Sequence, residues 1–156
     1  MEDLSDIYND IIMEHGMNSY NKKKLDEADL SEIGHNPNCG DEINLEVKLD
    51  DNVIVDMAFT GHGCAISQAS TSVMIDTLKG KKVDEAINII KIFISMIKRE
   101  DVSEENLEKL EDAICFKNVS NMPARVKCAL LAWHTLEDML EKNISSASTS
   151  FGCCNN

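Results

Sequence analysis

The chain has 156 residues with 43% hydrophobic residues, which is enough for one domain with its own core. Its formal net charge of −13 argues against nucleic acid and against anionic membrane surfaces as partners, because both are bound through Lys and Arg. No segment is apolar and long enough to span a bilayer, and the first residues lack the basic and apolar parts of a secretory signal.

The first half of the chain predicts one helix followed by strands. Apolar residues recur at helical spacing from Leu4 to His15, which indicates an amphipathic helix. A short strand is expected near residues 32–36. Two stretches of alternating apolar residues follow, separated by turn-forming residues 50–52, and predict a β-hairpin with one buried face. The residues expected on that face are Ile43, Leu45, Val47 and Leu49, then Val53, Val55, Met57 and Phe59.

The second half predicts helices. One is expected from Ala65 to Leu78, with Gly80 near its C-cap, and a strongly apolar one over residues 84–98. Ser103 could cap a third, and a last helix should begin at Pro123 and run to about residue 142. Strands followed by helices are typical of an α+β domain, which we place at residues 1–144. The polar, serine-rich residues 145–156 are expected to form a flexible tail.

Acidic residues are concentrated between Glu100 and Asp112, where seven are acidic and Lys109 alone is basic. A solvent-facing helix surface is the favoured interpretation. A docking surface for a basic partner is the alternative.

Six cysteines remain to be explained. Because no targeting signal is present, we expect a cytoplasmic protein, in which cysteines indicate metal ligands or reactive thiols rather than disulfides. Cys39 lies in a turn-forming sequence with Asp41 two residues later, so both could contact one ion. Cys64 lies at a junction between strand and helix, where the helix N-terminus favours thiolate over thiol.

Cys128 lies early in the last helix, one turn after Arg125 and next to Lys127, and both cations favour its thiolate. The separations between Cys39, Cys64 and Cys128 match no general zinc motif, so spacing alone leaves a shared metal site open. His62 is an alternative ligand, although a solvent-facing loop histidine is the simpler interpretation.

The other cysteines have simpler interpretations. Cys115 lies between Ile114 and Phe116 and is expected to be a small buried hydrophobe. Cys153 and Cys154 lie in the polar tail, where they could be incidental, bind soft metals or deliver sulfur.

Three blocks of sequence surround the candidate ligands. They are Asn-Pro-x-Cys-Gly-Asp at residues 36–41, Gly-x-Gly-Cys-Ala-Ile-Ser-x-Ala-Ser at 61–70 and Pro-Ala-Arg-Val-Lys-Cys-Ala-x-Leu-Ala-Trp at 123–133. In their order and flanking pattern they resemble the signature blocks of the SufU branch of the IscU/NifU-like family of iron–sulfur cluster assembly proteins. The resemblance covers residues 4 to 142.

The resemblance implies a small three-stranded antiparallel sheet with about five helices packed against it. It implies that one metal ion is bound, zinc by preference, with iron or a [2Fe–2S] cluster as the alternative. It also implies a PLP-dependent cysteine desulfurase of the SufS type as partner, and downstream cluster assembly proteins. The implied ligands are Cys39, Asp41, Cys64 and Cys128.

Two roles are compatible with this ligand set. In the first, the protein is a zinc-dependent sulfur acceptor, at most a sulfurtransferase partner of the desulfurase. Cys39 then carries the persulfide, and Arg125 stabilises thiolate charge or orients Asp41. In the second, the protein is a scaffold on which a [2Fe–2S] cluster is assembled and transferred to apoproteins. Purely structural zinc is disfavoured by Asp41, because structural sites are usually built from Cys and His alone.

Departures from the IscU type favour the acceptor role. Lys127 stands where IscU-type proteins carry a histidine, residues 121–125 replace their Leu-Pro-Pro-Val-Lys motif, and the acidic stretch resembles the SufU insertion before the last helix. Residues 17–21 depart from the Asn-Pro-Arg-Asn turn that is frequent in the family, which leaves the details of desulfurase docking open.

Overall fold

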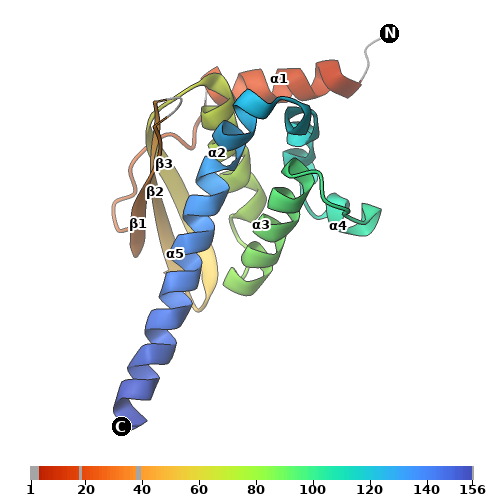
Figure 1. Ribbon diagram of the computed structural model, residues 1–156. Coiled ribbons are helices and arrows are strands. Elements are labelled where there is room, and N and C mark those ends of the chain that lie inside the picture. The colour runs from red at the N-terminus through yellow and green to blue at the C-terminus, as the bar shows by residue number, and fades with distance from the viewer. Residues whose placement is uncertain (1–3, 18, 38–39, 156) are drawn as a thin grey trace.

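The computed structural model describes residues 4–17, 19–37 and 40–155, with side chains for residues 10–16, 19–37 and 40–145. In this part of the chain, one antiparallel sheet of three strands has the order β1-β2-β3. The sheet lies to one side of the helices (Figure 1). The expected α+β fold with a small three-stranded sheet is confirmed. The strands are β1 (Leu30–Asn36), β2 (Asp41–Asp50) and β3 (Val53–His62).

The β2–β3 hairpin has the expected turn and one unexpected irregularity. Asp51 and Asn52 have φ angles of 52° and 61°, as a two-residue turn of type I′ requires. Further along, the register shifts between Lys48 and Leu49, so that Val55 has no partner in β2. Because the bulge adds one residue to β3, the alternation of the two faces is interrupted at Val55. The prediction of a buried Val55 is therefore wrong: it is 39% exposed, and Ile54 is buried in its place.

The described chain also contains five α-helices and one 3₁₀ helix, η1. The helix predicted from Ala65 to Leu78 has these bounds. The seven acidic residues between Glu100 and Asp112 are all exposed, as expected, and Ser103 Oγ accepts a hydrogen bond from Asn106 N–H at 3.2 Å. None of the described helices is long and apolar enough to cross a membrane. The helices are α1 (Leu4–Met17), α2 (Ala65–Leu78), α3 (Val83–Ile97), α4 (Glu104–Glu108), η1 (Glu111–Asn121) and α5 (Pro123–Asn155).

Helix α5 is longer than the sequence predicts. It does not end near residue 142 but continues to Asn155, and its last turns project beyond the sheet (Figure 1). Residues 145–151 contain no Pro or Gly, and alanine and serine among them are compatible with a helix. The flexibility expected of residues 145–156 stays a prediction. The domain boundary at residue 144 stays a prediction.

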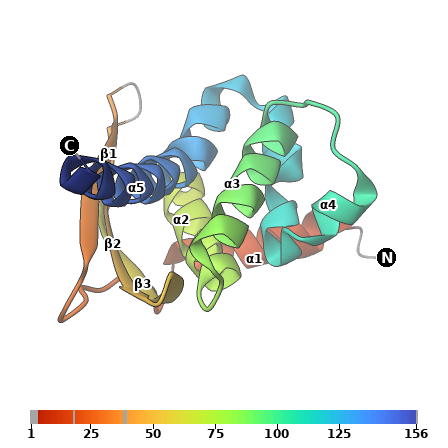
Figure 2. The same ribbon diagram turned by 90° about the horizontal axis from the view of Figure 1, so that it is seen from below.

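Buried contacts between α2, α3 and α5 fix the start of α5. The view in Figure 2 shows α2 and α5 between the sheet and α3. The Trp133 indole of α5 stacks on Phe93 of α3 with 3.8 Å between ring centroids. Its Nε1–H donates to Ser70 Oγ of α2 at 2.9 Å, and that hydroxyl donates to the Ala129 carbonyl at 2.6 Å. These bonds set the position of Cys128, the neighbour of Ala129.

Candidate metal centre

Three elements bring potential metal ligands together. Asp41 is the first residue of β2, Cys64 directly precedes α2, and Cys128 lies in the second turn of α5. One carboxylate oxygen and the two sulfur atoms all lie within 4.8 Å of one another. The start of α5 lies at the opposite end of the molecule from its projecting last turns (Figure 1). Three residues that the sequence predicts as ligands therefore form one cluster.

Asp41 is the most constrained member of the cluster. Its side chain is fully buried, and its Oδ1 accepts a hydrogen bond from Cys64 N–H at 2.8 Å. Its Oδ2 is buried and has no hydrogen-bond partner among the described residues. Because a buried carboxylate oxygen without a partner is costly, this atom is suited to bind a cation. The donor set of two sulfurs and one oxygen fits zinc.

The two glycines before Cys64 allow this arrangement. Gly61 has a φ of 126°, in the region that favours glycine, and a side chain there would collide with the Glu42 carbonyl. At Gly63, a Cβ would lie 2.5 Å from Asp41 Oδ1. Glycine at residue 63 therefore leaves the space that the Asp41 carboxylate needs beside the Cys64 amide.

The two cysteines have different environments. Cys64 is half-buried at the N-cap of α2. Cys128 is 1% exposed and is covered by the helices around it. His62, the alternative ligand, is exposed and does not belong to the cluster of neighbouring ligand atoms.

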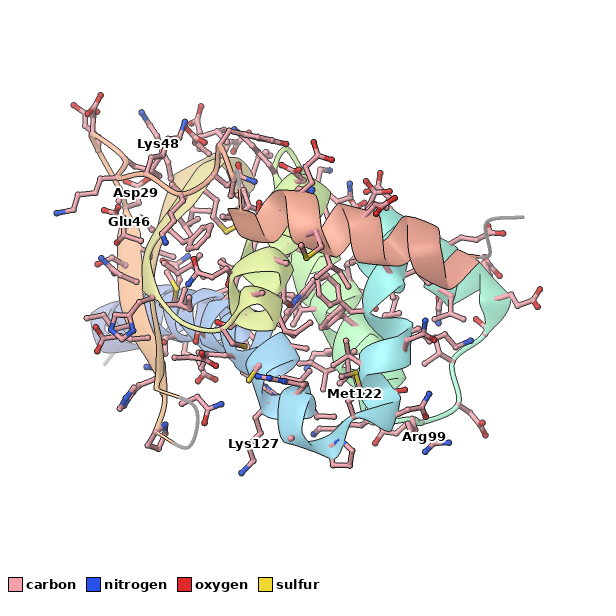
Figure 3. The ribbon with its side chains drawn as sticks, turned by 90° about the horizontal axis from the view of Figure 1, so that it is seen from above. Asp29, Glu46, Lys48, Arg99, Met122 and Lys127 are labelled. Carbon is pink, nitrogen blue, oxygen red and sulfur yellow. The ribbon has the colours of Figure 1, made fainter. Side chains whose placement is uncertain are left out.

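Arg125 lies at the outer side of the two sulfur atoms. Its guanidinium is exposed and its pKa is raised above the usual value, first by Coulomb attraction to Cys64 and then by a hydrogen bond to Cys128. Lys127, two residues later, is also exposed, but its side chain points away from the body of the protein (Figure 3). Of these two cations, Arg125 is the one that contacts the cluster.

Of the four remaining cysteines, Cys115 alone has a described side chain. Cys39 lies outside the described residues, so its place among the ligands stays a prediction, as does the whole ligand assignment. Cys115 is 1% exposed, and burial, followed by the charge of Asp112, raises its pKa to about 12. It is the buried thiol that the sequence predicts. The side chains of Cys153 and Cys154 are outside the described part.

Two polar features escaped the sequence analysis. One is Ser67, whose buried hydroxyl lies beside Gly63. The other joins α1 and the loop after it to α2: His15 Nδ1 of α1 lies 2.7 Å from Ser72 Oγ, and Asn21 Nδ2 of the loop donates to Asp76 Oδ1 at 3.0 Å. The signal in the sequence was the presence of serines at positions 67 and 72 of a helix that is mostly buried, since buried polar groups require partners.

Comparison with known proteins identifies the family. The model of the NifU-like N-terminal domain matches residues 7–142. The chain belongs to the NifU-like N-terminal domain family. This confirms the resemblance found in the three sequence blocks.

Relatives of this NifU-like chain carry both of the names that the sequence analysis considered. The iron–sulfur cluster assembly scaffold protein IscU of Thermotoga maritima is 39% identical over 87% of this chain and 94% of its own length. The zinc-dependent sulfurtransferase SufU of Bacillus subtilis is 38% identical over 89% and 92%. The crystal structure of a scaffold protein for the SUF system from Fervidobacterium islandicum has a TM-score of 0.79 and 42% identity, over 86% of this chain and 97% of that one.

Proposed function

We propose that this NifU-like chain acts in iron–sulfur cluster assembly as a zinc-dependent acceptor of sulfur from a cysteine desulfurase. One observation carries the proposal: the buried Asp41 carboxylate, whose Oδ2 has no hydrogen-bond partner among the described residues, lies beside the sulfurs of Cys64 and Cys128. An oxygen ligand among thiolates is the one that a soft ion holds least firmly. Such a site can open a position, as catalytic zinc sites do.

The ligands would be Asp41, Cys64 and Cys128 together with Cys39, which follows from the family resemblance. Bound zinc would keep the sulfurs deprotonated at neutral pH. Three thiolates and a carboxylate carry more negative charge than one Zn²⁺ neutralises, so a nearby cation is favourable. Arg125, which contacts the sulfurs of Cys64 and Cys128, fits that role.

In the proposed reaction, the Cys39 thiolate attacks the outer sulfur of a persulfide on the desulfurase. A sulfur–sulfur bond forms at Cys39, the bond within the enzyme's persulfide breaks, and its electron pair leaves with the enzyme's cysteine as a thiolate. The exchange is redox-neutral and requires no further reactant. Arg125 would offset the negative charge of the sulfurs while the two proteins are in contact.

The scaffold role, with a [2Fe–2S] cluster or iron, is the second candidate, because three thiolates also suit clusters. In addition, the relative named as a scaffold and the relative named as a sulfurtransferase are almost equally identical to this chain, at 39% and 38%. Lys127 favours the acceptor. Its ammonium has no lone pair to offer an ion, and its side chain points away from the protein (Figure 3). A SufS-type, PLP-dependent desulfurase as partner and a cytoplasmic location belong to the same proposal.

The decisive experiment measures sulfide release by the cognate desulfurase with and without the zinc-loaded protein. We expect stimulation by the wild type, and none by Cys39→Ala, which should still bind the enzyme. Arg125→Ala and Lys127→Ala form a matched pair, since both remove an exposed cation from the same turn of α5. The first should lower the stimulation and the second should not.

The scaffold interpretation makes the opposite prediction. If the zinc form gives no stimulation, and protein purified without oxygen carries a cluster that it transfers to an apoprotein, the acceptor proposal is wrong. Zinc content is measured in parallel. Cys64→Ala and Cys128→Ala should lower it, and Cys115→Ala should leave it near one ion per chain.

A further inference from the structure

The Asp41 carboxylate has a single hydrogen-bond donor among the described residues. Cys64 N–H holds Oδ1, while Oδ2 has no partner among the described residues. If Asp41 leaves the ion, Oδ2 loses its ligand bond in a fully buried position. A buried carboxylate oxygen without a donor opposes that displacement. A second donor close to Asp41 would make the displacement easier.

Helix α2 contains a buried hydroxyl with no bond of its own. It carries five hydroxyl residues, and four of them have hydrogen bonds. Thr71 and Thr77 bond to carbonyls one turn earlier, Ser70 bonds to α5, and Ser72 bonds to His15. Ser67, which is 1% exposed, is the exception: its Oγ has no partner among the described residues. Such an atom in a native core calls for an explanation.

The same small space beside Gly63 holds both groups. The point where a Cβ of residue 63 would lie is 2.5 Å from Asp41 Oδ1 and 3.0 Å from Ser67 Oγ. Since glycine has no side chain, no atom of residue 63 separates the hydroxyl from the carboxylate. A small rotation of either side chain could bring them into hydrogen-bond contact.

We propose that Ser67 is a positioning residue that receives Asp41 when the carboxylate leaves the metal. The Ser67 hydroxyl would then donate to the displaced carboxylate, so that Asp41 stays buried and paired and can return to the ion. This rests on the proposed function, because it takes Asp41 to be a labile metal ligand. In this proposal, the Ser67 hydroxyl controls how readily Asp41 leaves the metal.

The test uses the full chain loaded with Co²⁺, whose visible spectrum reports the ligands. Imidazole is added as a small ligand that can take the position of Asp41, and its Kd is read from the spectral change. Ser67→Ala should weaken imidazole binding about tenfold, as expected for the loss of one charge-assisted hydrogen bond to the displaced carboxylate. Tighter binding in this variant would mean that Ser67 holds Asp41 on the metal, which overturns the proposal.

Two further variants separate this role from a structural one. Thr77→Val removes another buried hydroxyl, in the last turn of α2 away from the candidate ligands, and it should leave the imidazole Kd unchanged. In an Asp41→Ala background, Ser67→Ala should change the Kd less than twofold, because the carboxylate that it serves is absent. An equal effect of Ser67→Ala with and without Asp41 contradicts the inference.

The proposed metal site can fail separately. If wild type and Asp41→Ala give the same Co²⁺ spectrum and the same imidazole Kd, Asp41 is not a ligand, and the proposed site is wrong. If Asp41→Ala changes both and Ser67→Ala changes neither, the site stands and the role of Ser67 is wrong. Urea unfolding of each variant confirms that the compared proteins are folded.

Discussion

Replacing Gly63 by alanine tests the geometry of the site directly. The new Cβ would lie 2.5 Å from Asp41 Oδ1, whereas ordinary van der Waals contact begins at 3.4 Å. The carboxylate must therefore move by about 1 Å. That movement breaks the 2.8 Å hydrogen bond to Cys64 N–H and shifts the carboxylate relative to the sulfurs of Cys64 and Cys128.

The expected loss can be estimated from these contacts. A hydrogen bond to a charged group contributes about 1.5–3 kcal/mol, so the unfolding free energy of metal-free Gly63→Ala should fall by about that amount. Zinc affinity should fall as far as it does in Asp41→Ala, because the same oxygen ligand is lost. Urea unfolding measures the first quantity, and competition with a chromogenic chelator measures the second.

Two comparisons make the result interpretable. Gly80→Ala is a matched control, since Gly80 has a φ of 88° and no atom of another part of the chain within 4 Å of its Cβ position. It should lower stability by about 1 kcal/mol and leave zinc affinity unchanged. In an Asp41→Ala background, Gly63→Ala should cost little further. Wild-type stability and zinc affinity in Gly63→Ala would refute the close approach of Asp41 to residue 63.

Three further predictions concern the core and the ion. Ser70→Ala should lower the unfolding free energy by about 1–3 kcal/mol, measured by urea unfolding, because Trp133 Nε1 loses its buried acceptor. The Cys115 thiol, whose pKa is raised from 9.0 to about 12, loses its proton earlier in the unfolded chain. Stability should therefore fall as pH rises from about 9 towards 12, more steeply than in Cys115→Ala, as followed by urea unfolding at each pH. Removing zinc with a chelator should lower the Tm but leave one cooperative transition by circular dichroism, because the core does not depend on the ion; complete unfolding would instead indicate structural zinc.

The order and type of the elements follow from local sequence. Helix α2 has the bounds that its small residues and Gly80 predict, because helix propensity and C-capping act over a few residues. The hairpin turn at Asp51 and Asn52 is equally local. The bulge at Val55 is not, since nothing in an alternating sequence marks the residue that lacks a partner across the sheet.

The candidate site also depends partly on local sequence and partly on tertiary contacts. The three cysteine blocks are recognisable in the sequence, and they were sufficient to predict the family that the comparison confirmed. Their separations, however, do not place Asp41, Cys64 and Cys128 together. Contacts between β2, α2 and α5 decide that, because they join segments far apart in the chain.

Ser67 and Ser70 show what tertiary structure alone decides. Both are buried serines on α2, three residues apart, and helical spacing places them near one face. Packing gives Ser70 two partners on α5, the Trp133 indole and the Ala129 carbonyl. It leaves Ser67 beside Gly63 and the Asp41 carboxylate. The sequence determined which side chains are available, and the long-range contacts of α2 determined which atoms they face, because a hydroxyl's partner lies on another segment.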